Sequence, residues 1–290
     1  MNLTELETPC LILNKKKLNH NIKKFNDRIQ KMGVQLRPHG KTAKNIDVIK
    51  MCLTDVSQGI TVSTLKEAEY YFSHGIKDII YAVGIAPIKL ERVVNLINKG
   101  CEFTIILDSF EQAEAVSKKA GEHNIQIPVC IEVDCDGQRS GIKPNDKLLV
   151  DLAQMLNQAI NINLKGVLTH AGTSYHCKNT EEIKAVAEME RDSALICAER
   201  FKQSNLPCPL VSIGSTPTAL FAEKFQGITE VRAGVYMFMD LVMAGLEVCT
   251  LEDIAVSVLA SVIGHQKNKG WVIISTRDSL RLFAQRGIQG

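Results

Sequence analysis

Long apolar runs, paired cysteines and a strong charge imbalance are all missing from this chain of 290 residues. No apolar stretch is long enough to span a bilayer, so we expect no membrane segment. The formal net charge is only +2 and aromatic residues make up 5% of the chain, which argues against nucleic acid or an anionic membrane as a partner. The opening residues, MNLTELETPCLIL, contain acids and a proline where a signal peptide would have basic and apolar regions.

The nine cysteines lie far apart, and none forms a CxxC pair. Their odd number and wide spacing argue against a disulfide framework or a zinc ribbon. Free thiols are typical of the cytosol, so we expect a cytoplasmic protein. The chain also lacks GxGxxG, GxxxxGK[ST] and GxSxG, which leaves a dinucleotide fold, a P-loop and a hydrolase nucleophile elbow without support.

What the chain does have is a regular alternation of short apolar runs with longer amphipathic segments. Strands that read as continuous apolar runs are typical of a parallel sheet buried on both faces. The expected strands are Gln35–Arg37, Ile60–Val62, Ile79–Val83, Phe103–Leu107, Val129–Val133, Leu164–Thr169, Leu210–Ile213 and Glu230–Arg232. The expected helices are Lys16–Met32, Thr64–His74, Lys89–Lys99, Ser109–Glu122, Asp146–Leu156, Thr180–Phe201 and Thr216–Glu223.

Eight β-then-α units in a row most simply close into a (β/α)₈ TIM barrel, and a doubly wound open sheet is the alternative. After Asp240 the pattern changes to two strands, Ala255–Ile263 and Trp271–Ser275, joined by the polar turn Gly264–Gly270. We therefore expect a barrel over residues 1–245 and the start of a C-terminal β-domain over 246–290. A hairpin of this size cannot form its own core. Either it packs on the barrel, a partner chain covers it, or the chain is a fragment, and we expect this second domain to be incomplete in the chain.

The segment Leu36-Arg37-Pro38-His39-Gly40-Lys41-Thr42 places a lysine where an apolar run ends. In α/β proteins the chemistry sits at the carboxyl ends of strands. Burial there favours the neutral amine, which can form an imine with an aldehyde cofactor. The alternative is a surface lysine beside a turn.

Arg139 follows the strand Val129–Val133 in a loop with two glycines, and its planar fork suits a phenolate or a carboxylate. The alternative is a loop arginine paired with Asp134 or Asp136. The next loop, Thr169 to His176, contains two histidines and a tyrosine that can serve as acids or bases. The alternative is a pair of loop histidines without a role.

Two glycine-containing loops follow the last two expected strands. Gly214-Ser215-Thr216-Pro217-Thr218 combines a flexible backbone, hydroxyl donors and a helix N-terminus, which together favour an anion. An ordinary Ser/Thr N-cap is the alternative. Glu230-Val231-Arg232-Ala233-Gly234-Val235-Tyr236 repeats the layout one unit later. In TIM barrels these two positions are the frequent phosphate site.

In their order along the chain, these motifs resemble fold-type III pyridoxal-phosphate (PLP) enzymes of the alanine racemase N-terminal domain superfamily. The resemblance is to the branch of D-threonine aldolase and D-serine dehydratase. It rests on TPCLIL, RPHGKTAK, DCDGQRSGI, GVLTHAGTSY, VSIGSTPT and EVRAGVYMF.

The resemblance implies a role for each matching position. Lys41 takes the place of the Schiff-base lysine, Arg139 that of the arginine at the phenolic oxygen, and His170 that of the ring packed on the pyridine face. Arg232 matches the racemase arginine at the pyridine nitrogen. His39 is a further cofactor contact, and the phosphate set is Gly214, Ser215, Thr216, Gly234 and Tyr236. His176 matches a proposed catalytic base, with Tyr175 as a second acid–base candidate.

The chain also departs from this branch. It reads Lys41-Thr42-Ala43-Lys44 where the branch has KTHK. The family is expected to bind a divalent metal in its C-terminal β-domain, but we find no such ligands in this chain, whose last histidine is His265.

The resemblance implies a PLP-dependent lyase of D-amino or 3-hydroxy-amino acids that performs retro-aldol cleavage through a Lys41 aldimine. A racemase, a D-serine dehydratase, or an impaired PLP-binding protein without the metal site are alternatives. Unrelated barrel chemistry with a phosphate ligand is a further one. The expected partners are a small amino-acid substrate and a second copy in a homodimer.

Overall fold

The computed structural model describes residues 2–55, 57 and 59–275. The chain forms two compact units. The larger unit runs from Phe25 to Gly234, and the smaller one combines the segment before Phe25 with the segment after Gly234. The sequence-based division at residue 245 stays a prediction, and the last part of the predicted second domain, residues 276–290, lies outside the described residues.

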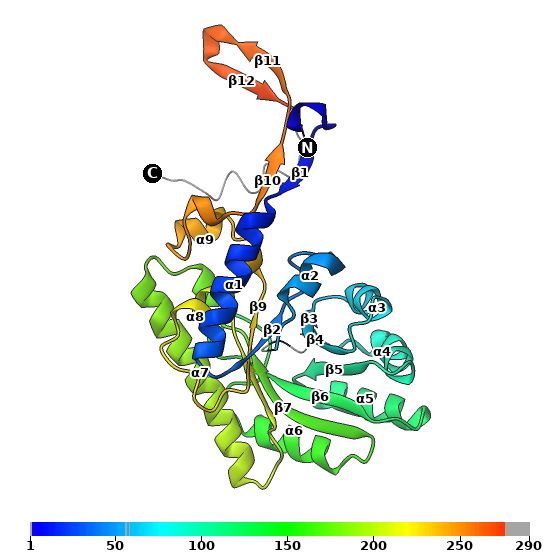
Figure 1. Ribbon diagram of the computed structural model, residues 1–290. Helices are drawn as coiled ribbons and strands as arrows, with labels where there is room; N and C mark the ends of the chain where they lie inside the picture. The colour runs from blue at the N-terminus through cyan, green and yellow to red at the C-terminus, as the bar shows by residue number, and fades with distance from the viewer. Residues whose placement is uncertain (1, 56, 58, 276–290) are drawn as a thin grey trace. The chain divides into compact units, whose positions relative to one another are not determined.

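A ring of parallel strands forms the centre of the larger unit (Figure 1). In order around the sheet they are β2 (Gln35–Pro38), β9 (Glu230–Ala233), β8 (Leu210–Ile213), β7 (Ile162–Thr169), β6 (Ile127–Val133), β5 (Glu102–Leu107), β4 (Asp78–Gly84) and β3 (Ile60–Val62). The two ends of the sheet meet where His39 pairs with Thr61 and the Gly40 N–H donates to the Thr61 carbonyl at 2.8 Å. The predicted barrel is confirmed, and the open-sheet alternative is wrong.

Helices alternate with the strands along the chain. They are α1 (Lys15–Lys31), α2 (Ile46–Cys52), α3 (Leu65–Ser73), α4 (Leu90–Asn98), α5 (Phe110–Glu122), α6 (Lys147–Gln158), α7 (Thr180–Gln203) and α8 (Thr216–Phe221). Four of them begin one residue later than predicted; in three of these, Thr64, Ser109 and Asp146 are N-caps with extended backbones. Each cap side chain accepts a hydrogen bond from a first-turn N–H of its helix.

The barrel interior is apolar in its middle and charged near the strand starts. Ile80, Ile106, Cys130 and Leu168 form the apolar cluster. At one end of this cluster, Asp78 and Glu230, the first residues of β4 and β9, both pair with the Arg37 guanidinium of β2. The Arg37 Nη atoms lie 2.8 and 3.0 Å from the Asp78 carboxylate, and its Nε lies 2.7 Å from Glu230. One arginine therefore ties three strands together.

The smaller unit contains two short antiparallel ladders. β1 (Cys10–Leu13) pairs with β10 (Val256–Leu259), and β11 (Val262–Gln266) pairs with β12 (Trp271–Ile274). The predicted strand Ala255–Ile263 is wrong as a single element, because its two halves pair with different partners. The turn before β12 is η6 (Lys267–Lys269), closed by Gly270 in the left-handed region.

Two further elements of the smaller unit, β1 and α9 (Leu241–Gly245), were not predicted. Across the described residues, no helix combines the length and the apolar character needed to cross a bilayer.

Candidate active site

Lys41 stands at the carboxyl end of β2, just past the point where the ring closes. The preceding Gly40 carbonyl accepts a hydrogen bond from the Tyr71 hydroxyl at 2.9 Å. A Cβ at position 40 would lie 2.6 Å from Cε2 of the Tyr71 ring, so glycine is required there. This packing fixes the backbone that carries the lysine.

The surroundings of Lys41 favour its neutral amine. Although its side chain reaches solvent, burial by neighbouring protein atoms lowers the pKa of Lys41, and the positive charges of Arg139 and Arg232 lower it further. Glu67 opposes these effects from α3. A lysine held this way is a better nucleophile at neutral pH than a solvated one.

Arg232 lies on β9, fully enclosed by the barrel. Its Nη1 donates to the Ser212 hydroxyl at 2.6 Å, and its Nη2 donates to the Thr169 carbonyl. The Ser212 hydroxyl in turn donates to Glu230 at 2.6 Å. Because Glu230 also binds Arg37, a continuous line of polar contacts runs from the strand starts to the carboxyl end of the barrel.

Arg139 lies in the loop after β6 and packs against the turn that follows β7. A Cβ at Gly172 would lie 3.1 Å from the Arg139 Nε atom. Asp136 accepts from the Thr173 N–H at 2.9 Å, and Asp134 accepts from an N–H of its own loop. Within the described residues neither carboxylate forms an ion pair with Arg139, so the predicted alternative of a paired loop arginine is not what the structure has.

The imidazole of His170 is held in one tautomer. Its Nδ1 lies 2.9 Å from the Gly214 carbonyl, and because a carbonyl only accepts, Nδ1 carries the hydrogen. Burial lowers the pKa of His170 to about 4; the Gly214 contact opposes the shift, and Arg139, Arg232 and Lys41 add to it. His170 is therefore neutral at neutral pH, with Nε2 as an acceptor.

His39 is the second neutral imidazole of the site. Its Nδ1 accepts from the Lys41 N–H at 3.4 Å, and its Nε2 lies 3.4 Å from the Ser63 hydroxyl. Burial, followed by the charges of Lys41 and Arg232, lowers the pKa of His39 well below its ordinary value.

The loop after β8 is fully buried and tightly ordered. Gly214 has φ +124°, and a Cβ there would lie 2.6 Å from the Arg232 carbonyl oxygen. The Ser215 hydroxyl caps α8 by accepting from the Thr218 N–H at 3.2 Å, and it lies 2.9 Å from the Ser174 hydroxyl. The predicted N-cap alternative therefore describes the geometry of Ser215, and the cap also fixes the turn at Thr216. The next predicted anion loop is close-packed too, since a Cβ at Gly234 would lie 2.5 Å from the Thr42 hydroxyl.

The other predicted residues are less closely joined to this cluster. The His176 side chain is exposed, and the His176 backbone N–H donates to the Thr173 carbonyl at the end of η3 (Gly172–Tyr175). The Tyr175 ring centre lies 6.1 Å from that of His170. Tyr236 is buried in η4 (Val235–Met237), which belongs to the smaller unit.

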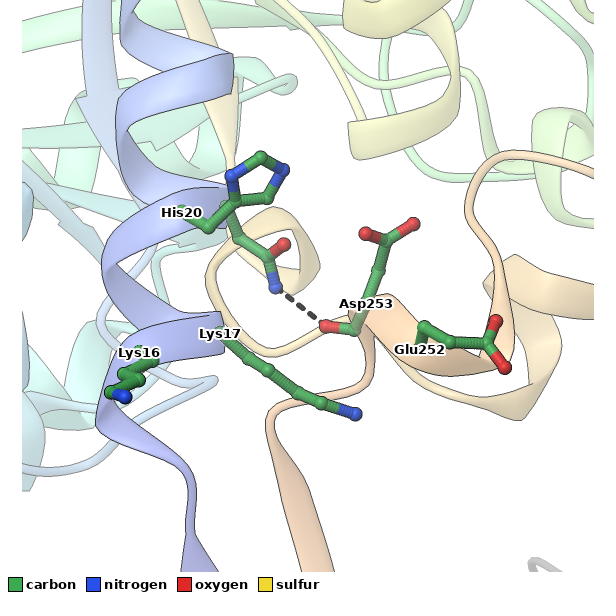
Figure 2. A pocket seen from close by; sticks show the side chains of 6 residues that line it. Lys16, Lys17, His20, Glu252 and Asp253 are labelled. Carbon is green, nitrogen blue, oxygen red and sulfur yellow. Dashed lines mark hydrogen bonds between the residues drawn. The ribbon is translucent and has the colours of Figure 1, made fainter.

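A separate pocket lies within the smaller unit, between α1 and η5 (Leu251–Asp253) (Figure 2). Lys16, Lys17 and His20 line it from α1, with Glu252 and Asp253 opposite. The side-chain amide of Asn21 on α1 donates to the Asp253 carbonyl at 2.8 Å. This pocket has charges of both signs and contains none of the predicted site residues, so the barrel cluster is the candidate active site.

Comparison with known proteins agrees with the barrel. The family described as alanine racemase, N-terminal domain, matches residues 13–242. The chain belongs to this family.

D-threo-3-hydroxyaspartate dehydratase of Delftia sp. (strain HT23) is 45% identical over 94% of this chain and 72% of its own length. Its solved structure superimposes with a TM-score of 0.92. D-serine dehydratase of Dictyostelium discoideum is 30% identical over 99% of this chain and 76% of its own length. D-threonine aldolase of Arthrobacter sp. is 27% identical over 82% of this chain and 62% of its own length. The chain is thus a fold-type III PLP enzyme of the alanine racemase N-terminal domain family, and a lyase.

The barrel cluster fits PLP. Lys41, Arg139 and Arg232 lie near enough to one another to lower the pKa of Lys41, and the two imidazoles beside them are neutral. Such an excess of positive charge suits a ligand with a phosphate and a phenolic oxygen. The described residues offer no comparable metal site, because no group of three His, Cys, Asp or Glu side chains among them could hold an ion.

Sequence reasoning missed Glu190, which lies completely buried on α7. Its Oε1 accepts from the Ala171 and Gly214 N–H groups, in the loops after β7 and β8. A signal for it exists in the sequence, because Glu190 shares helical spacing with the buried residues Ile183, Ala187 and Ala194. A carboxylate on an otherwise apolar helix face indicates a buried polar contact.

Proposed function

We propose that this chain is a PLP-dependent dehydratase of 3-hydroxy-D-amino acids, with Lys41 as the residue that holds PLP covalently. The observation that carries the proposal is the amine of Lys41, whose pKa is lowered at the carboxyl end of the barrel by burial and by Arg139 and Arg232. The higher identity with a dehydratase than with an aldolase favours loss of water over the retro-aldol cleavage placed first by the sequence.

Each residue of the cluster has a task in this proposal. When bound, PLP supplies an electron sink for the bond that breaks at the substrate α-carbon. The Arg139 guanidinium offers two N–H groups to a phenolic oxygen, and His170 presents a flat neutral ring to a pyridine face. Arg232, held by Ser212 and the Thr169 carbonyl, would supply a fixed positive charge to the pyridine nitrogen of PLP.

The remaining tasks are binding the phosphate and moving protons. We assign the phosphate to Gly214, Ser215, Thr216 and Gly234, with His39 as a further cofactor contact, and the role of Tyr236 stays a prediction. The neutral amine of Lys41 can take the α-proton of the substrate. Tyr175 and His176 are our proposed groups for protonating the leaving hydroxyl, since their turn is tied through Thr173 to the loop of Arg139. A homodimer in the cytoplasm also stays a prediction.

The decisive experiment identifies the lysine and the products together. The protein is incubated with PLP, reduced with borohydride and digested, and the pyridoxyl group is located by mass spectrometry. We expect it on Lys41, lost in Lys41→Ala and retained in Lys44→Ala, which removes a nearby exposed lysine paired with Glu67. A pyridoxyl group retained by Lys41→Ala would refute the assignment.

Products then separate the possible reactions. From D-threo-3-hydroxyaspartate, loss of water and hydrolysis of the resulting enamine give oxaloacetate and ammonia. Retro-aldol cleavage gives glycine and glyoxylate instead, and racemisation gives neither. Glycine in place of ammonia would overturn the dehydratase in favour of the aldolase. No turnover, despite a pyridoxyl group on Lys41, would favour the impaired PLP-binding alternative.

A further inference from the structure

One carboxyl group on an outer helix is bonded to two loops of the candidate active site. Glu190 of α7 has no exposed surface, and its Oε1 accepts from the Ala171 N–H at 2.8 Å and from the Gly214 N–H at 3.1 Å. Ala171 directly follows His170 after β7, and Gly214 follows β8. A single oxygen atom therefore joins the backbone of two neighbouring strand ends.

Both contacts of Glu190 help to position the His170 ring. The Gly214 peptide donates its N–H to Glu190, while the neighbouring Gly214 carbonyl accepts from His170 Nδ1 at 2.9 Å. Glu190 also holds the residue that follows His170 along the chain. The position of the imidazole and the hydrogen on Nδ1 thus both depend on where the Glu190 carboxyl lies.

The turn that begins at Gly214 is ordered by the same carboxyl. Thr218 opposes the rise in the pKa of Glu190, and the Thr218 hydroxyl accepts from the Ser215 N–H at 3.0 Å. The turn assigned to the phosphate is therefore fixed at its start by Glu190 and at its end by the Ser215 cap.

Burial of this carboxyl is unfavourable for the fold alone. A buried carboxyl is destabilising unless it is fully hydrogen-bonded. The second oxygen of Glu190, Oε2, is buried and has no hydrogen-bond partner among the described residues. Burial also raises the pKa of Glu190. Its neighbours on this helix face, such as Ala187 and Ala194, are apolar. An apolar residue at position 190 would avoid this penalty but would remove the acceptor of the Ala171 and Gly214 N–H groups, which points to a role in ordering the site loops.

We infer that Glu190 is a positioning residue of the cofactor site, which holds the His170 ring and the Gly214–Thr216 turn in one arrangement. Its action is that of a hydrogen-bond acceptor for two N–H groups. The part that concerns PLP rests on the proposed function. The part that concerns His170 is a property of the protein by itself.

The test uses two substitutions at this position and a matched control on the same helix. Glu190→Gln keeps an acceptor oxygen, whereas Glu190→Met fills the space without one. Glu188→Met is the control, since Glu188 is exposed two residues away. The first readout is the ratio of the dissociation constants for pyridoxal and PLP, measured by absorbance titration. Loss of two hydrogen bonds corresponds to roughly a tenfold or larger change in binding.

We expect Glu190→Met to lower the preference for PLP over pyridoxal by about tenfold or more. Glu190→Gln and Glu188→Met should keep the wild-type ratio. A merely structural role would weaken both ligands alike and leave the ratio unchanged, and that result would overturn the inference. So would a folded Glu190→Gln variant that loses the preference, because the acceptor is still present in it.

The second readout needs no cofactor. Nitrogen NMR of the His170 ring in the protein without PLP should show hydrogen on Nδ1 in the wild type and in Glu190→Gln. Glu190→Met should give a mixture of tautomers, and an unchanged spectrum would overturn the inference. If the wild type does not bind PLP, the proposed function fails, and the NMR result still decides the role of Glu190.

A third variant guards against a Glu190→Met protein that does not fold. Ala171→Pro removes one of the two donors and leaves the carboxyl in place, and the Ala171 φ of −76° already suits proline. This variant should also disturb the His170 tautomer. A folded Ala171→Pro protein with the wild-type spectrum would contradict the proposed contact.

Discussion

The Tyr71 hydroxyl donates to the Gly40 carbonyl, 2.9 Å away, and the Tyr71 ring fills the space into which a side chain at position 40 would project. This pair sets the path of the chain immediately before Lys41. Tyr71 belongs to α3, so a helix outside the barrel determines the backbone position of the proposed PLP lysine.

Gly40→Ala should therefore both destabilise the protein and disturb the lysine. A Cβ only 2.6 Å from the ring forces a backbone shift, for which overpacking typically costs about 1–3 kcal/mol. We expect a lower urea midpoint and less borohydride-trapped pyridoxyl group on Lys41. Gly245→Ala is the control, because nothing lies within 4 Å of a Cβ there. Tyr71→Leu combined with Gly40→Ala should recover part of both losses. Equal behaviour of the two alanine variants would contradict this relationship.

Acid should destabilise the protein without PLP through His170. The pKa of His170 is about 4 in the folded chain against 6.5 for an ordinary histidine, so below pH 6.5 the unfolded state binds the proton more readily. The contribution of neutral His170 to the free energy of unfolding is complete above pH 6.5 and is lost as the pH falls toward 4. Urea unfolding at pH 7 and at pH 4.5 measures this. Between the two, the free energy of unfolding should fall by about 2–3 kcal/mol more in the wild type than in His170→Asn. Parallel pH profiles would exclude this role.

Arg37 should be far more important for stability than an exposed arginine. Arg37→Met leaves Asp78 and Glu230 without their common partner inside the barrel, and breaking a buried pair costs about 3–5 kcal/mol. Arg92→Met removes an exposed pair with Glu69 and should cost less than about 1 kcal/mol. Urea unfolding of the two variants measures the difference, and similar losses would argue against a buried network.

Arg139 should control how readily Lys41 loses its proton. Removing its positive charge in Arg139→Met is expected to move the pKa of Lys41 upward, toward the ordinary value. The measurement is competitive acylation of Lys41 as a function of pH in the protein without PLP. Labelling should shift to higher pH in Arg139→Met and stay unchanged in Arg139→Lys, which keeps the charge. A shift in both variants would indicate a geometric effect in place of the electrostatic one.

The barrel could be predicted because its strands are buried on both faces. Segments such as Phe103–Leu107 and Val129–Val133 read as continuous apolar runs, which are typical of a parallel sheet covered on both faces, and eight such units in a row most simply close into a barrel. The small strands could not be predicted equally well. β1 has only four residues, and its partner β10 lies near the other end of the chain, so no local pattern specifies the pairing.

The same reasoning explains what could be predicted of the site. Lys41, Arg139 and His170 follow strands of the ring, Arg232 lies near the end of β9, and the carboxyl ends of parallel strands meet at one edge. Their interaction with each other is therefore a consequence of topology. Glu190 belongs to the outer layer, and its reach between two strand ends depends on how α7 packs, which the sequence alone does not reveal.

The pairing of β1 with β10 has a consequence for synthesis of the protein. The ribosome releases β1 first, yet its partner strand emerges only after all eight barrel strands have been made. Because nascent chains fold from the N-terminus as domains become complete, the barrel has all of its own residues before β1 can be paired. β1 must therefore remain an unpaired edge until all eight barrel strands and β10 have been made.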